Sequence, residues 1–219
     1  MICFVIALES EAKPVLDNMT DISAKTVHGK NVYCGLLSGE RTGIVVCGVG
    51  KANAAAGAQY AIDCLNAEKI VNVGVAGGLN GGMKIAEIYC IAEAVQYDFD
   101  LVQLNGTQIG TLNEFDKPYV PLAVCREYPQ RRLATGDRFN DDIKDFTLLT
   151  QTLEADIRDM EGGAIAQICA HADVPCYSFK AISDVAGSGS TTEQFSANLS
   201  ACTDRLKEQI TRIYEAVNG

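Results

Sequence analysis

Two acidic residues occupy positions where a helix is expected to begin and a strand to end. Glu161 opens the small-residue stretch GGAIAQICAHA, whose spacing predicts a helix, and Asp184 closes an apolar stretch that predicts a strand. Open sheets bind ligands beyond the ends of such strands. A carboxylate there can accept hydrogen bonds, and a carboxylic acid can donate a proton if its surroundings raise its pKa. Each residue also has a structural interpretation, Glu161 as an acid at a helix start and Asp184 as a turn residue.

Two glycine-rich stretches, GVGKA at residues 48–52 and GVAGGLNGG at residues 74–82, invite comparison with phosphate-binding loops. A P-loop requires glycine where Val45 stands and serine or threonine where Ala52 stands. Asn53 occupies the third glycine position of a dinucleotide fingerprint. Each stretch is therefore interpreted either as a tight turn or as a place where the backbone approaches a ligand closely.

The order of apolar and polar segments predicts a single α/β domain over residues 1–219. Strands are expected near residues 2–8, 31–37, 42–47, 69–82 (running into a glycine loop), 87–95, 119–124, 131–137 and 153–159, and in an apolar stretch that ends on 183–184. Helices are expected near residues 9–19, 48–67, 140–146, 161–172 and 191–217, with a long loop over 97–118. This alternation indicates a twisted, mixed and mostly parallel sheet flanked by helices.

Composition excludes several classes of partner and cofactor. The chain of 219 residues is 47% hydrophobic and carries a formal net charge of −10. An acidic surface repels phosphate backbones and anionic lipids, so neither nucleic acid nor membrane is an expected partner. Nine cysteines without C-x-x-C spacing sit mostly in apolar runs and indicate reduced thiols in a cytoplasmic protein. With only two histidines, neither a metal centre nor a histidine-based nucleophile triad is expected. No cofactor is expected either.

Five stretches together resemble the purine nucleoside phosphorylase and nucleosidase superfamily, and most closely its methylthioadenosine/S-adenosylhomocysteine nucleosidase branch. They are ALESEAKPVL (7–16), CGVGKANAAAGA (47–58), VNVGVAGGL (71–79), DMEGGAIAQICAHADVPCYSFKAISDVA (159–186) and, more weakly, ATGDRF (134–139). The combination of DMEGGAIA with AISDVA is the most specific part. The resemblance implies a nucleoside phosphorylase-like fold and cleavage of the bond between a purine and a ribose.

The resemblance implies distinct catalytic roles for Asp184 and Glu11. Asp184 matches the acid that protonates the leaving purine near N7, and Ser183 beside it would fix its orientation. Glu11 matches the base for a water that attacks the opposite face of the ribose, whereas Glu9 fits a solvated first helical turn. Two carboxylates on opposite sides of the scissile bond follow the logic of inverting glycosidases.

The same resemblance implies the substrate-binding residues. Glu161 would accept hydrogen bonds from the ribose 2′- and 3′-hydroxyls, and Met160 would pack under the ribose. Phe139 matches an aromatic that stacks on the purine, and a core aromatic is the alternative interpretation. The other expected members lie in the matched stretches and are Leu8, Val75 and Gly77.

Three positions depart from the family pattern. Val75 stands where a hydroxyl residue is usual, near the position of the attacking water or phosphate. Lys180 replaces an arginine, which keeps the charge and loses the planar fork of donors. Gly162 and Gly163 replace bulkier residues and weaken the helix start by about 1 kcal/mol each relative to alanine.

The predicted function is hydrolysis of the N-glycosidic bond of a 5′-substituted adenosine, of the methylthioadenosine or S-adenosylhomocysteine type, releasing adenine and a thioribose. Phosphorolysis requires cations to hold phosphate, and the loop after the first strand offers only Lys13. Two alternatives stay open: a purine nucleoside phosphorylase, and a catalytically inert protein that binds nucleosides.

The 5′-group and the assembly are less determined by the sequence. Residues 97–118 lie where nucleosidases hold the 5′-group, and the resemblance fades after YDFD. Futalosine-type substrates therefore stay open as well. A homodimer is the family expectation, with Phe99, Leu101 and Leu104 as candidate contacts.

Overall fold

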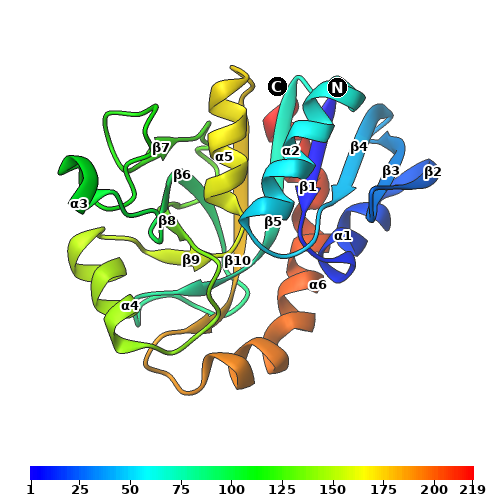
Figure 1. Cartoon of the computed structure of the whole chain (residues 1–219). Helices are drawn as coiled ribbons and strands as arrows, with labels where there is room; N and C mark the ends of the chain where they lie inside the picture. Colours follow the sequence, from blue (N-terminus) through cyan, green and yellow to red (C-terminus); the bar gives the residue numbers. More distant parts are fainter.

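A mixed β-sheet forms the centre of the molecule in the computed structural model, which describes residues 1–219 (Figure 1). Its strands are β1 (Ile2–Ile6), β2 (Met19–Val27), β3 (Lys30–Leu37), β4 (Glu40–Val46), β5 (Lys69–Gly78), β6 (Ile88–Gln96), β7 (Val120–Pro121), β8 (Gln130–Thr135), β9 (Ile157–Asp159) and β10 (Cys176–Val185). The order is β10-β6-β8-β9-β5-β1-β4-β3-β2, with β7 paired to β6. Because β10 also pairs with β5, strands β5, β10, β6, β8 and β9 close into a ring.

Helices cover both faces of this sheet. They are α1 (Glu9–Leu16), α2 (Lys51–Leu65), α3 (Val102–Asn105), α4 (Ile143–Thr147), α5 (Gly162–His171) and α6 (Thr191–Asn218), and the π-helical turn η1 (Leu148–Thr152) continues α4. On one face, α2 and α5 lie side by side and share a buried cluster rich in alanine (Figure 1). On the other face, α1 and α6 share a second cluster with β1, β5 and β10.

The central strands are apolar because helices cover both of their faces. Every residue of β1 is buried, which explains the continuous apolar run in the sequence. In α6, the buried residues Cys202, Leu206, Ile210, Ile213 and Val217 recur at helical spacing and hold the helix against β10 and α1. The first turn of α6 is thereby fixed just beyond the carboxyl end of β10.

The predicted fold is confirmed: one α/β domain has a mixed sheet flanked by helices. Five strand pairs are parallel and five are antiparallel, so the sheet is mixed without the predominance of parallel pairing that was expected. The sequence did not predict β2, because residues 20–26 are exposed and carry no apolar alternation. The helix expected over residues 9–19 ends at Leu16, and the loop expected over 97–118 contains α3.

The helices and two side chains of residues 97–118 bear on contacts with a membrane and with a second copy of the chain. No helix has both the length and the apolar composition needed to cross a bilayer. Phe99 packs partly against the buried cluster around β6 and β8, whereas Leu104 is 79% exposed. Leu104 is therefore the more accessible of these two for a contact with a second copy, and the homodimer stays a prediction.

Candidate active site

One cavity of about 530 Å³ brings together all the residues that the sequence proposed for the site. They are Leu8, Glu11, Val75, Gly77, Phe139, Met160, Glu161, Ser183 and Asp184. The segments that supply them follow β1, β8 and β9 or form the carboxyl ends of β5 and β10. A cavity of this volume can hold a small-molecule ligand.

Glu11 lies in the first turn of α1 with its carboxylate turned inward. The residue is 4% exposed, and its oxygens accept hydrogen bonds from the backbone N–H groups of Val75 (2.8 Å) and Leu8 (3.1 Å). Gly74 provides the necessary space, because a Cβ there would lie 2.7 Å from Oε1 of Glu11. Burial raises the pKa of Glu11, and the backbone donors offset only part of that rise.

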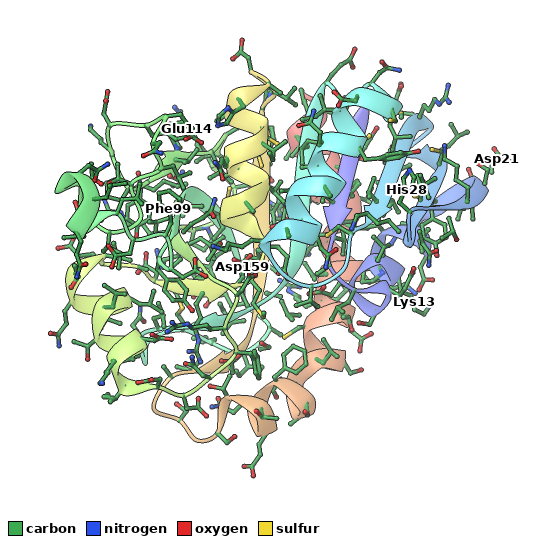
Figure 2. The ribbon with its side chains drawn as sticks, viewed as in Figure 1. Lys13, Asp21, His28, Phe99, Glu114 and Asp159 are labelled. Atoms are coloured by element: carbon green, nitrogen blue, oxygen red, sulfur yellow. The ribbon has the colours of Figure 1, made fainter.

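A buried ion pair lies among the strand ends next to this carboxylate. Nζ of Lys180 is 2.9 Å from Oδ2 of Asp159, and both side chains are 2% exposed. Asp159, in the middle of the molecule in Figure 2, also accepts hydrogen bonds from the Thr135 hydroxyl (2.5 Å) and the Gly162 N–H (2.9 Å). Burial tends to lower the pKa of Lys180, but Asp159 and Glu161 outweigh it and raise that pKa, so the lysine stays charged.

Glu161 precedes α5 and is 8% exposed. Its Oε1 accepts a hydrogen bond from the N–H of Gly50 (2.9 Å), which has a φ of 96° that suits glycine. Burial and repulsion from Asp159 raise the pKa of Glu161 to about 7, although Lys180 opposes the shift. This carboxyl group therefore changes its charge near neutral pH.

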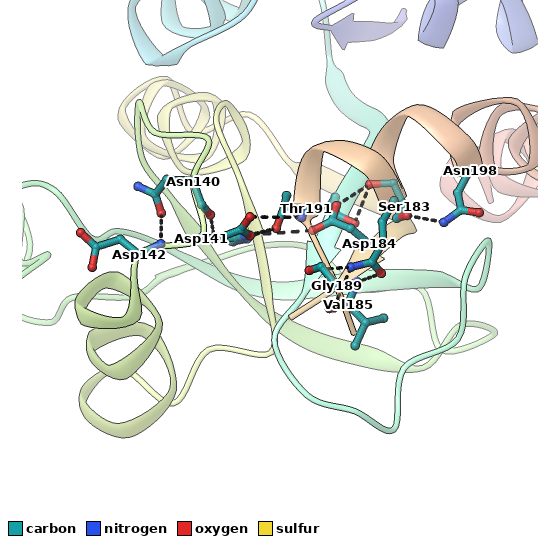
Figure 3. Close-up of polar contacts among 12 residues, drawn as sticks. Asn140, Asp141, Asp142, Ser183, Asp184, Val185, Gly189, Thr191 and Asn198 are labelled. Atoms are coloured by element: carbon teal, nitrogen blue, oxygen red, sulfur yellow. Dashed lines mark hydrogen bonds and ion pairs between the residues drawn. The ribbon is translucent and has the colours of Figure 1, made fainter. Parts of the chain in front are cut away.

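A bulge in the pairing of β10 with β5 places Ser183 and Asp184 on the cavity wall. Asp184 is 3% exposed, and its Oδ2 accepts a hydrogen bond from the Ser183 hydroxyl (2.8 Å; Figure 3). Burial raises the pKa of Asp184, and Ser183 and the Arg158 guanidinium offset only part of that rise. Asp184 therefore holds a proton more tightly than an exposed aspartate does.

Aromatic rings form another part of the wall. Phe139 meets Phe195 of α6 edge to face, with ring centroids 5.7 Å apart. Phe139 is 51% exposed, so the interpretation of this ring as a core aromatic is wrong. An exposed aromatic face beside the cavity can stack on a flat ligand.

Nine residues of the cavity were not predicted from the sequence. They are Ala7, Val49, Ala76, Arg138, Arg158, Asp159, Thr192, Phe195 and Ser196. One signal was available: the spacing of Thr192, Phe195 and Ser196 places them on one face of a helix.

The geometry supports acid–base chemistry on a small ligand. One carboxyl group, Asp184, lies beside a hydroxyl and a guanidinium, whereas Glu11 and Glu161 surround a buried lysine. Burial raises the pKa of all three carboxyl groups, so each of them can exchange a proton closer to neutral pH than an exposed carboxyl group does. No group of three or more histidine, cysteine, aspartate or glutamate side chains is arranged to hold a metal ion.

Known proteins match this chain in sequence and in structure. A curated 5′-methylthioadenosine/S-adenosylhomocysteine nucleosidase of Bacillus cereus (strain G9842) is 29% identical over 199 residues, which cover 85% of this chain and 86% of the relative. Nucleosidases are hydrolases of N-glycosidic bonds.

Solved structures share the fold. Futalosine hydrolase of Helicobacter pylori strain 26695 superposes with a TM-score of 0.90 at 21% identity, covering 98% of this chain and 97% of that chain. A 5′-methylthioadenosine/S-adenosylhomocysteine nucleosidase of Colwellia psychrerythraea 34H in complex with adenine also has a TM-score of 0.90, at 23% identity, covering 98% and 94%. A family model described as the phosphorylase superfamily matches residues 1–217. The chain therefore belongs to the phosphorylase superfamily.

Proposed function

We propose that this protein is a nucleosidase that hydrolyses the N-glycosidic bond of a purine nucleoside. One observation carries the proposal: Glu11, Glu161 and Asp184, far apart in the sequence, line a single cavity, and burial raises the pKa of all three carboxyl groups. The nucleosidase activity for which the Bacillus cereus relative is named supports it.

In the proposed reaction, Asp184 is the general acid. It gives its proton to N7 of the purine while the electron pair of the C1′–N9 bond moves onto the base. The raised pKa of Asp184 favours the protonated form that the step requires. The Ser183 hydroxyl, which donates to Oδ2, fixes the orientation of the carboxyl group.

Glu11 and Glu161 act on the sugar. Glu11 takes a proton from a water that attacks C1′ from the face opposite the base, and two backbone N–H groups hold its carboxylate in place. Glu161 accepts hydrogen bonds from the ribose hydroxyls, and its charge stabilises the positive charge that develops on the sugar.

Water is a better nucleophile than phosphate for this site. A phosphate beside Glu11 and Glu161 would face two carboxylates, and the nearby Lys180 is already paired with Asp159. The arginines that line the cavity lie elsewhere: Arg158 beside Asp184, and Arg138 paired with Asp145. The valine at position 75 offers no hydroxyl to either nucleophile.

We propose a 5′-substituted adenosine of the methylthioadenosine or S-adenosylhomocysteine type as substrate, with adenine and a thioribose as products. The naming of the curated relatives supports this choice. Apolar side chains of Leu8, Val49 and Phe195 on the cavity wall suit an uncharged thioether.

We also expect a cytoplasmic homodimer, and the nine cysteines, all free of disulfides, fit a reducing compartment.

Replacing Asp184 by asparagine removes the proton donor and keeps the size of the side chain. We expect kcat with methylthioadenosine to fall by at least about 10²-fold, measured as adenine release. A 4-nitrophenyl riboside has a leaving group that needs no proton, so Asp184→Asn should cleave it at a rate near that of the wild type. Equal losses on both substrates would exclude Asp184 as the acid.

Glu11→Gln and Glu9→Gln form a matched pair on one helix. Glu11 is buried in the cavity, whereas Glu9 is exposed and bonds to Asn31 and Tyr33. We expect Glu11→Gln to lower kcat by at least about 10²-fold and Glu9→Gln to change it by no more than about twofold. If the wild type binds the nucleoside but releases no base, the protein is an inert binder and the proposed activity is wrong.

Glu161 should destabilise the folded protein above neutral pH. Its pKa rises from 4.5 to about 7 on folding, so the folded protein favours the protonated form of this group. The favourable contribution of the group to the free energy of unfolding is therefore complete below pH 4.5 and is lost as the pH rises through about 7. Urea unfolding should therefore show that Glu161→Gln is more stable than the wild type at pH 8 by on the order of 1–3 kcal/mol, with a smaller difference at pH 4.5. A difference that does not change with pH would mean that the pKa is not raised.

A further inference from the structure

Arg158 lines the cavity and neither gives nor takes a proton in the proposed hydrolysis. It lies on β9 opposite Gly77 of β5, and its side chain is 14% exposed. Asp184 of β10 pairs with the same glycine from the other side. A Cβ at Gly77 would lie 2.7 Å from Oδ1 of Asp184 and 3.2 Å from Nε of Arg158, so the missing side chain lets both groups reach one part of the cavity wall.

The guanidinium of Arg158 is held in a fixed position. Nη1 donates to the backbone carbonyl of Asn140 (2.7 Å), and Nη2 donates to the hydroxyl of Thr191 (2.9 Å). Thr191 in turn donates to Asp141 (Figure 3). These bonds use two of the five N–H donors of the guanidinium. Nη2 is 3.9 Å from Oδ1 of Asp184, which is too long for a direct hydrogen bond.

Most of the hydrogen-bond acceptors near the Arg158 guanidinium already have partners. The Asp141 carboxylate, whose Oδ1 lies 3.9 Å from Nη2, accepts from Thr191, and only Oδ1 of Asp184 accepts no hydrogen bond. The Asn140 carbonyl and the Thr191 hydroxyl accept from Arg158, and Oδ2 of Asp184 accepts from Ser183. A guanidinium has donors and no acceptor. The wall next to Asp184 is therefore rich in hydrogen-bond donors. A ligand group that accepts hydrogen bonds binds better there than a ligand group that donates them.

The chemistry of purines defines which group this wall meets. The purine edge that carries N7 also carries the substituent at C6, which is an acceptor oxygen in hypoxanthine and guanine and a donor amino group in adenine. A base positioned to take a proton from Asp184 at N7 therefore presents its C6 substituent to the neighbouring wall. Arginine is a common donor to the oxygen and N7 of this edge in other recognition sites.

We propose that Arg158 is a specificity-determining residue that donates a hydrogen bond to a carbonyl at C6 of the leaving purine, so that 6-oxopurine nucleosides are substrates alongside adenosines. The inference rests on the proposed function, because that function places N7 at Asp184. The bonds made and broken are those of the proposed hydrolysis, and Arg158 transfers no proton.

Two substrates that differ only at C6, 5′-methylthioinosine and 5′-methylthioadenosine, provide the test. The ratio of their kcat/KM values, inosine over adenosine, should be at least about tenfold lower in Arg158→Met than in the wild type. Asp184 serves both substrates, so any effect of the substitution on the protonation of Asp184 cancels in the ratio. An unchanged ratio would overturn the proposal.

Two further variants separate this contact from general effects. Arg158→Lys keeps the charge and loses the fork of donors, so its ratio should fall between those of the wild type and Arg158→Met. Arg138→Met removes the other arginine of the cavity, which is 55% exposed and bound to Asp145, and should change the ratio by less than about twofold. An equal fall in the ratio for Arg138→Met and Arg158→Met would contradict a specific role for Arg158. Thermal unfolding of each variant establishes that it is folded.

Binding of the free bases tests the inference without any turnover. Calorimetry with hypoxanthine and adenine should show that Arg158→Met weakens hypoxanthine binding at least about tenfold more than adenine binding. If no nucleoside is cleaved but this difference is present, the proposed function is wrong and the role of Arg158 is supported. If the relative affinities of the two bases are the same in both proteins, the role of Arg158 is excluded whether or not hydrolysis occurs.

Discussion

One buried lysine balances part of the negative charge on which the site is built. Lys180 is paired with Asp159, and Glu161 and Glu11 also contribute to the rise of its pKa. Three carboxylates against one ammonium leave an excess of negative charge in a buried place, and burial raises the pKa of both glutamates. In the proposed reaction, positive charge develops on the ribose next to these groups. The positive charge of the transition state then compensates the excess negative charge, which has no such partner in the free protein. An interaction that is stronger in the transition state than in the free protein lowers the barrier of the reaction.

Strand β5 determines how the acid and the base approach each other. Strand β5 pairs with β1 and β10, and two of its glycines lie against the proposed catalytic carboxyl groups. Gly74 lies beside Glu11 and Gly77 beside Asp184. In both places a Cβ would lie 2.7 Å from a carboxylate oxygen. The glycine-rich sequence of this strand, which fits no nucleotide fingerprint, is thus explained by the close approach of side chains, and the N–H of Val75 adds a hydrogen bond to Glu11.

The sequence predicted the layers of the fold and the segments that surround the cavity, because buried strands and the amphipathic helix α6 have clear periodicity. The resemblance of short motifs located Glu11, Glu161 and Asp184, whose roles are proposals. The pairing of Lys180 with Asp159 could not be predicted from the sequence, because that contact joins two strands across the sheet and only the register of β9 and β10 around β5 creates it. Arg158 was missed for a similar reason: β9 is too short for its alternation to stand out.

The central claim is that water, and not phosphate, attacks the ribose between Glu11 and Glu161. The most direct measurement is release of the base from methylthioadenosine in phosphate-free buffer and again with added phosphate, with the sugar product identified by proton and phosphorus NMR. We predict equal rates under both conditions and free thioribose as the sugar product. Release that requires phosphate and yields the sugar 1-phosphate would contradict it.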